Sequence, residues 1–128
     1  LYPALMQGDG APGSIMAALD HIHESGPIFD CVTIIRGGGS KADLEVFNDY
    51  DLAYYITQFP LPVVSGIGHE RDEAVTDMVS ARALKTPTAV AEFLVDQLLA
   101  FEFRLAGLYD RMAALVRGRV QGHLSSLA

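Results

Sequence analysis

The chain has 128 residues, half of them apolar, with 16 acidic and 9 basic side chains and a net charge of −7. No apolar run reaches the ~18 residues that a membrane span requires, and the first residues lack the basic and apolar regions of a secretory signal. The single Cys31 excludes an internal disulfide framework, which fits the cytosol, and suits a small buried side chain. The acidic charge argues against a domain that binds nucleic acid by itself, because such domains usually present a basic face.

The first third of the sequence predicts a helix followed by a buried strand. Residues 1–6 read as the end of a strand, and the glycine-rich loop after them leads to Ser14, a suitable N-cap. Apolar residues recur at helical spacing from Ile15 to His23, and Gly26 and Pro27 then end the helix. The continuous apolar, β-branched run from 29 to 35 is typical of a strand that is covered on both faces.

The middle of the sequence repeats this alternation. Residues 42–59 read as a helix with six apolar or aromatic residues inward, residues 61–67 as a second buried strand, and 70 to about 80 as a third helix. Helical connections between strands favour parallel pairing with right-handed crossovers. The predicted fold is α/β, a Rossmann-like parallel sheet with helices on both faces. The inward residues of the first helix are Leu44, Phe47, Leu52, Tyr55, Ile56 and Phe59.

The last third predicts one long helix that begins after Thr86, where Pro87 suits the first helical position. Its apolar residues then step by four and three, as in a heptad seam. The seam consists of Leu94, Leu98, Phe101, Leu105, Leu108, Met112 and Leu115. We expect the helix to pack on the sheet as far as Leu98 and to meet a partner chain or a further segment beyond Ala100. Its three glycines each cost about 1 kcal/mol relative to Ala, which predicts frayed last turns.

The first glycine-rich turn follows the strand at 29–35 and reads Arg36-Gly37-Gly38-Gly39-Ser40. Glycines between a strand and a helix let backbone N–H groups approach an anion, and the helix N-terminus favours negative charge. Arg36 adds a planar fork of donors that suits phosphate oxygens. A tight strand-to-helix turn without a ligand explains the glycines equally simply.

The second turn, Gly66-Ile67-Gly68-His69-Glu70-Arg71-Asp72, repeats the arrangement after the strand at 61–67. His69 can act as a general acid or base near pH 7, and Asp72 can orient its ring or hold a cation. The alternatives are a capping His and acids that merely favour a first helical turn. Asp77 is expected to fix a neighbouring loop. Because parallel strands open on one edge of the sheet, where ligands usually bind, the two turns together suggest phosphate-ester chemistry.

Supporting residues and metal ligands are less clearly marked. Asp43 can bond the backbone of the first glycine turn and Asn48 can face the site, although exposed helix positions suit both. The remaining histidines show no metal-ligand spacing, and no Cys/His cluster supports zinc, so no metal ligand is assigned.

Taken together, these motifs resemble the large subunit of bacterial exodeoxyribonuclease VII. The resemblance covers residues 1–93 in order and spacing, and the helix after it looks like the start of that subunit's long helical region. We therefore divide the chain into a nuclease catalytic core at 1–93 and a helical, coiled-coil region from 94 to 128. The matching motifs are Leu1-Tyr2-Pro3-Ala4 with Gln7-Gly8, Arg36-Gly37-Gly38-Gly39-Ser40 with Asp43-Leu44 and Phe47-Asn48, Gly68-His69-Glu70 with Asp72 and Asp77, and Thr86-Pro87-Thr88-Ala89 with Ala91-Glu92.

The resemblance implies an enzyme of the cytoplasm that hydrolyses single-stranded DNA from its ends into short oligonucleotides. By motif, Arg36, His69 and Asp72 correspond to catalytic residues of the family. The helical region implies small subunits of the enzyme as partners. Members of the family differ in their need for Mg²⁺, so the resemblance leaves the cofactor open.

The resemblance also implies that the catalytic core is incomplete at its N-terminus, with a further catalytic Asp and a DNA-capturing OB-fold lying before residue 1. An OB-fold elsewhere in the polypeptide would reconcile an acidic core with a DNA substrate. Two other functions stay open. One is a non-catalytic module that binds nucleotides or sugar phosphates, and the other is a scaffold that acts through the heptad helix alone.

Overall fold

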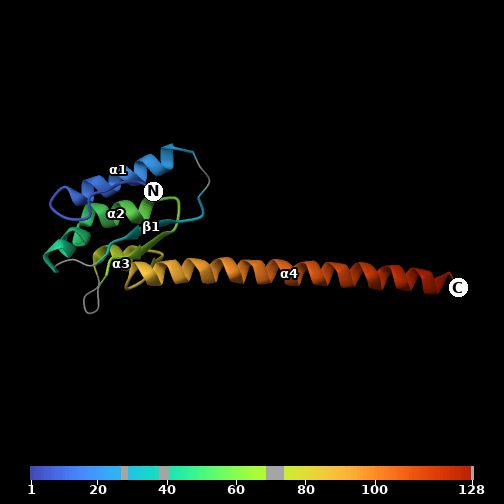
Figure 1. The fold of residues 1–128 in the computed structure, drawn as a ribbon. Coiled ribbons are helices and arrows are strands. Elements are labelled where there is room, and N and C mark those ends of the chain that lie inside the picture. The colour runs from blue at the N-terminus through green and yellow to red at the C-terminus, as the bar shows by residue number, and fades with distance from the viewer. Residues whose placement is uncertain (27–28, 38–40, 69–73, 128) are drawn as a thin grey trace. The chain divides into compact units, whose positions relative to one another are not determined.

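The computed structural model describes residues 1–26, 29–37, 41–68 and 74–127, without the side chains of residues 41–43 (Figure 1). The chain divides into two units, Leu1–Ala91 and Glu92–Ala128. The first unit holds the sheet and the shorter helices. The second consists of most of the long C-terminal helix.

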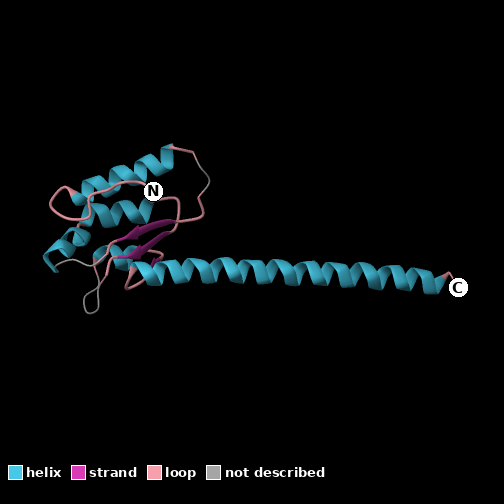
Figure 2. Cartoon of the chain, in the orientation of Figure 1, coloured by secondary structure: helices cyan, strands magenta, loops and turns pink. Residues whose placement is uncertain are grey.

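The first unit is built on three parallel strands, as the sequence predicts (Figure 2). They are β1 (Val32–Ile35), β2 (Val63–Gly66) and β3 (Arg82–Ala83), in the order β1-β2-β3. β1 and β2 are shorter than the apolar runs that contain them. β3 was not predicted because its two residues are exposed, and backbone bonds beside it, from Ala81 N to Val63 O and from Leu84 N to Ser65 O, both 2.9 Å, join this segment to β2.

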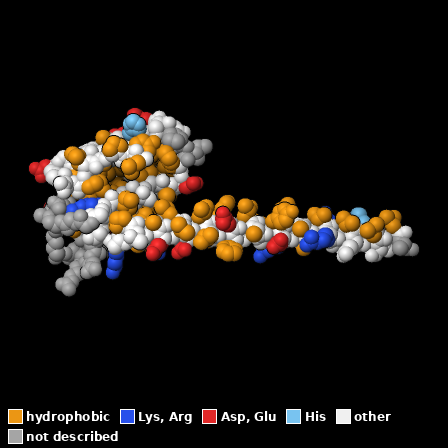
Figure 3. All heavy atoms as spheres, in the orientation of Figure 1, with side chains coloured by type: hydrophobic (Ala, Val, Ile, Leu, Met, Phe, Trp, Pro, Cys, Tyr) orange, Lys and Arg blue, Asp and Glu red, His pale blue; other side chains and the backbone are white. Residues whose placement is uncertain are grey.

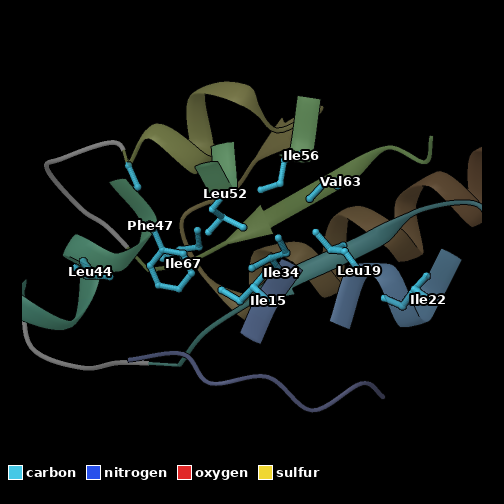
Figure 4. Packing of buried hydrophobic residues seen from close by; sticks show 11 residues of the cluster. Ile15, Leu19, Ile22, Ile34, Leu44, Phe47, Leu52, Ile56, Val63 and Ile67 are labelled. Carbon is cyan, nitrogen blue, oxygen red and sulfur yellow. The ribbon is translucent and has the colours of Figure 1, made fainter. Parts of the chain in front are cut away.

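Helices lie on both faces of the sheet. On one face, α1 (Ala11–Glu24) packs against Ile34 of β1, and its Ile15, Leu19 and Ile22 belong to the main core cluster (Figure 4). Because side chains alternate along a strand, Gly66 faces the opposite side. There Val90, in the first turns of the C-terminal helix, lies so close that a Cβ on Gly66 would come within 2.4 Å of its Cγ2. This close approach explains the glycine.

The single helix predicted over 42–59 is two helices in the structure. A 3₁₀ helix, η1 (Lys41–Asn48), is followed by α2 (Tyr50–Gln58). The chain breaks at Asp49, which adopts an extended backbone and caps α2 by accepting a hydrogen bond from Leu52 N at 2.8 Å. The predicted inward positions are confirmed, since the three aliphatic side chains and Phe47 are buried and Tyr55 and Phe59 pack against the core.

Two helix starts also differ from the prediction. α3 (Val75–Val79) begins five residues later than expected, with Ala74 as its N-cap. α1 begins four residues earlier than expected, with Gly10 as its N-cap and Pro12 in its first turn. Ser14 therefore does not cap α1, and its hydroxyl instead accepts a hydrogen bond from Leu5 N at 2.9 Å.

The second unit is the continuation of α4 (Pro87–Ser126), a single helix that runs through its three glycines without a break (Figure 1). Val90 is the buried residue of α4 among those described, and the residues of the heptad seam are 37 to 71% exposed. Figure 3 shows apolar side chains gathered along this helix. The expected packing of the helix on the sheet as far as Leu98 stays a prediction.

Candidate functional site at the carboxyl edge of the sheet

The ends of all three strands meet at one edge of the sheet. Arg36, the residue after β1, donates its backbone N–H to Gly66 O at 3.1 Å, and Leu84, after β3, donates to Ser65 O. The two glycine-rich turns that the sequence singled out leave the sheet at this edge. Open α/β sheets bind ligands at the carboxyl ends of their strands.

Arg36 is held firmly at this edge. Its backbone continues the β1 ladder beyond the strand, and its side chain is only 9% exposed. A guanidinium in such a protected position loses little conformational freedom on binding, and its planar fork suits the paired oxygens of a phosphate. A Cβ added at the next residue, Gly37, would meet open space.

Gly68 brings the second turn to the same place. Its φ of +90° lies in the left-handed region that favours glycine. A Cβ built on it would lie 3.7 Å from the carbonyl oxygen of Arg36 and 4.0 Å from that of Lys85. The backbone that directly precedes His69 is therefore in contact distance of the residues that follow β1 and β3.

A buried Ser–Asp pair fixes the far end of this turn. Ser65 in β2 is fully buried and donates its hydroxyl to Asp77 Oδ1 at 2.5 Å, while Asp77 Oδ2 accepts from Ala74 N at 3.3 Å. The carboxylate thereby joins the middle of β2 to the N-cap of α3.

Asn48 and Thr76 add a second tie, from η1. Asn48 Oδ1 accepts a hydrogen bond from Val75 N at 3.1 Å, and the hydroxyl of Thr76 donates to Phe47 O at 2.8 Å. Asn48 is thus committed to the start of α3 through its side-chain oxygen. These bonds connect the segments that follow β1 and β2 at the carboxyl edge.

Several predicted site residues fall outside the described part of the chain. The structure brings Arg36, Gly37 and Gly68 to the carboxyl edge and places Asn48 and Asp77 behind it, as supports of α3. The residues outside the description are Gly38, Gly39, Ser40, His69 and Asp72, together with the side chain of Asp43.

Ser65 and Thr76 are structurally important residues that the sequence analysis missed. Both hydroxyl side chains are fully buried. A lone Ser inside a β-branched strand is a usable signal, since a buried hydroxyl needs a partner and the acid twelve residues later supplies one.

Two further properties bear on the class of site. Among the described residues, no three His, Cys, Asp or Glu side chains are grouped so that they could hold a metal ion. Within the same ranges, every helix is too short or too polar to cross a membrane.

Comparison with known proteins decides the family. The model of the family "Exonuclease VII, large subunit" matches residues 1–128. The chain belongs to the exonuclease VII large-subunit family.

Curated relatives of this family are clearly similar and much longer. The chain is 39% identical over 120 residues to a protein named exodeoxyribonuclease 7 large subunit from Lactobacillus johnsonii, and 41% identical over 125 residues to the protein of that name from Lactobacillus gasseri. A Clostridium novyi relative is 38% identical over 120 residues. Each match covers 94% of this chain but only 26, 27 and 30% of the relative.

The acidity of this exonuclease VII family member is confined to the first unit. Residues 92–128 carry four acidic and four basic side chains, so the net charge of −7 belongs to residues 1–91. The unit with the candidate site therefore repels polyanions at long range. A phosphate that binds there must therefore be held by groups in direct contact with it.

Proposed function

We propose that this chain supplies the catalytic core of an exodeoxyribonuclease that hydrolyses single-stranded DNA from its ends into short oligonucleotides, in the bacterial cytoplasm. The proposal combines membership of the exonuclease VII large-subunit family with the geometry of the carboxyl edge. The relatives are named exodeoxyribonuclease 7 large subunit, and the chain spans about a quarter of their length.

One observation carries the assignment of the site. The buried Arg36 follows β1, and Gly68, the neighbour of His69, lies so near that a Cβ built on it would be 3.7 Å from the carbonyl oxygen of Arg36. This closeness of the two turns supports the proposal that the guanidinium of Arg36 and the imidazole of His69 act on one phosphodiester.

In the proposed reaction each residue has a separate task. Arg36 binds two oxygens of the scissile phosphate and stabilises the negative charge that grows on them as water attacks. The oxygen of water forms a new P–O bond, the ester P–O bond breaks, and one proton passes to the leaving oxygen. His69 moves that proton, as the base toward water or the acid toward the leaving group, and Asp72 orients its ring.

The remaining predicted residues support these three. Backbone N–H groups of Gly37, Gly38, Gly39 and Ser40, with Gly68, are proposed to line the phosphate site, and Asp43 to brace the first turn. Asn48 and Asp77 support the reaction by holding α3 and thus the turn that carries His69. None of the proposed residues is assigned as a metal ligand. Titration with Mg²⁺ is therefore needed to decide whether the reaction depends on this ion.

The partner proposal concerns α4. The seven residues of its seam are apolar and exposed to water. Such a seam is typical of helices that pair with another helix through a heptad repeat. We propose that small subunits of exonuclease VII bind this seam. An acidic catalytic unit also needs a DNA-capturing element elsewhere in the assembly to reach its substrate.

The activity is tested with His69→Ala in the full-length large subunit assembled with its small subunits. We expect hydrolysis of a 5′-labelled and of a 3′-labelled single strand to fall by about 10²- to 10⁴-fold, the usual worth of a general acid or base. His23→Ala, at an exposed position of α1, is the matched control and should retain activity.

Nuclease activity that survives His69→Ala at the level of the control contradicts the catalytic assignment. In that case, binding of mononucleotides to the unchanged chain decides for the non-catalytic module. Titration of the wild-type enzyme with Mg²⁺ and EDTA in the same assay settles the cofactor.

A further inference from the structure

The basic residues of the first unit are concentrated in the segments that follow or contain the strand ends. Residues 1–35 carry four acidic side chains and no Lys or Arg, and residues 42–70 carry five acidic side chains and again no Lys or Arg. The positive charges of an otherwise acidic unit therefore belong to a few short segments. They are Arg36 and Lys41 after β1, Arg71 after β2, and Arg82 and Lys85 in and after β3.

Lys85 lies at the carboxyl edge, across the second turn from Arg36. β2 is the middle strand of the sheet, and the backbone that leaves it passes close to both neighbours. A Cβ built on Gly68 would lie 3.7 Å from the carbonyl oxygen of Arg36 and 4.0 Å from that of Lys85. The turn that carries His69 therefore leaves the sheet between Arg36 and Lys85.

The backbone on both sides of Lys85 is fixed by hydrogen bonds. Before it, Leu84 N donates to Ser65 O at 2.9 Å. After it, the hydroxyl of Thr86 accepts from Ala89 N at 3.1 Å. The Cα of Lys85 is thereby held at the carboxyl edge.

The side chains of Lys85 and Arg36 suit different tasks. The Arg36 side chain is only 9% exposed, whereas that of Lys85 is exposed to solvent. A buried planar guanidinium fits a phosphate that must be held in one geometry. An ammonium group on a flexible stem acts as a point charge and can follow a phosphate whose position varies.

We propose that Lys85 binds a phosphate of the DNA strand next to the scissile phosphate, so that the strand crosses the carboxyl edge from Arg36 to Lys85. The inference rests on the proposed function, because it takes single-stranded DNA as the substrate. The contact is ionic and independent of the base. It holds the strand against the repulsion of the acidic unit and takes no part in proton transfer.

Variants with the same change in net charge separate a direct contact from general electrostatics. Lys85→Met removes one positive charge at the carboxyl edge. Gln58→Glu adds one negative charge at the exposed end of α2, which precedes the amino end of β2 and so lies at the opposite edge of the sheet. Long-range repulsion responds to both changes, whereas a phosphate contact responds only to the first. Lys85→Arg keeps the charge and is the conservative variant.

Hydrolysis of a labelled single strand by the assembled full-length enzyme, measured at several KCl concentrations, gives the readout. One phosphate contact on a single strand contributes about 0.7 to the salt slope, which is worth about fivefold in affinity at 0.1 M salt. We therefore expect Lys85→Met to raise KM about fivefold at that salt, to leave kcat within about twofold, and to make the slope of log KM against log[KCl] shallower by about 0.7.

The control variants sharpen this expectation. Lys85→Arg should restore the KM and the slope of the wild type, and Gln58→Glu should change KM by less than about twofold. Thermal melting of Lys85→Met should match that of the wild type, because the side chain is exposed. Lys85→Gln is a second neutral variant that should repeat the result of Lys85→Met.

A KM and a salt slope for Lys85→Met that equal those of Gln58→Glu overturn the proposal, since Lys85 then only offsets negative charge. A lower kcat at unchanged KM overturns it as well. Failure of the proposed function looks different, because His69→Ala would then retain nuclease activity. Loss of activity in His69→Ala without an effect of Lys85→Met removes the Lys85 contact alone.

Discussion

The two units of the chain treat their apolar residues in opposite ways. In residues 1–91 most of the described large aliphatic side chains of α1, α2, β1 and β2 converge on one core, whereas along residues 92–128 most large apolar side chains are exposed (Figures 3 and 4). About half of the residues in each region are apolar. The difference teaches that the first unit buries its apolar residues in a core of its own, which the helix does not.

The two units also differ in net charge. The first unit holds the whole net charge of −7, and residues 92–128 are neutral overall. Because the helix has no net charge, it does not repel a charged partner, and apolar contacts can dominate the binding of a partner there. In the first unit, by contrast, the proposed recognition of phosphate rests on a few side chains and backbone groups at the carboxyl edge.

The largest effect is expected when the seam of α4 is broken. Leu105→Asp puts a charge in the middle of a seam that is 54 to 57% exposed at Leu105 and Leu108. Co-purification with the small subunit should be lost, while the free energy of unfolding of the α/β unit should change by less than about 0.5 kcal/mol. Pull-down and urea denaturation measure the two effects.

Phe103→Asp is the control for that experiment. Phe103 is more exposed than Leu105 and lies off the seam. If both variants lose the small subunit equally, the helix is recognised by overall hydrophobicity and the seam has no special role.

The next effect concerns the buried pair behind the site. Asp77→Ala leaves the hydroxyl of Ser65 and the N–H of Ala74 buried without their acceptor, so we expect a loss of about 3 kcal/mol in the free energy of unfolding. Ser65→Ala removes a donor and should cost about 1 kcal/mol. Urea denaturation of the single and double variants should show non-additive losses. Additive losses would mean that the two side chains do not act as a pair.

Alanine at two glycines should have opposite effects in the two units. At Gly66 a Cβ would meet Val90, Ile35 and the carbonyl of Thr86, so Gly66→Ala should destabilise the first unit by about 2 kcal/mol. At Gly107 a Cβ meets nothing, so Gly107→Ala should stabilise the helix by up to about 1 kcal/mol. Thermal melts of both variants check the signs, and equal signs would contradict the contrast between the units.

The smallest effect is a pH dependence at the surface of the first unit. The hydroxyl of Tyr55 donates to Asp20, and this bond raises the pKa of Tyr55 above its usual value. The bond stabilises the fold below the usual pKa of about 10, and this contribution is lost as the pH rises through the raised value. Tyr55→Phe should therefore change stability by no more than about 0.5 kcal/mol at pH 7 and flatten its decline above pH 10.

The elements that the sequence predicted best are those with a regular or unbroken pattern of apolar residues. β1, β2 and the seam of α4 follow from uninterrupted apolar runs and heptad spacing, because these patterns have few alternative structures. β3 could not be predicted, since its two exposed residues are held by backbone bonds to β2. The break at Asp49 was missed because the apolar period continues across it, although an Asp before a helical run is a recognisable cap.

The candidate site shows the same division. The residue types and strand ends predicted a common edge for Arg36 and the second turn, and Gly68 does lie near the backbone of Arg36, since a Cβ built on it would be 3.7 Å from the carbonyl oxygen of Arg36. The supports are harder to foresee, since Ser65, Thr76 and Asn48 act through tertiary hydrogen bonds over twelve or more residues. Spacing along the chain carries no signal for such bonds.

A double-mutant cycle on Arg36 and His69 tests the central claim most directly, that both side chains act on one phosphate at the carboxyl edge. In the assembled full-length enzyme, Arg36→Ala should lower kcat/KM on single-stranded DNA by about 10²- to 10³-fold. Because groups that serve one step are strongly non-additive, the double variant should lie within about tenfold of the worse single variant. Losses that multiply, or a single variant with wild-type activity, would contradict the account.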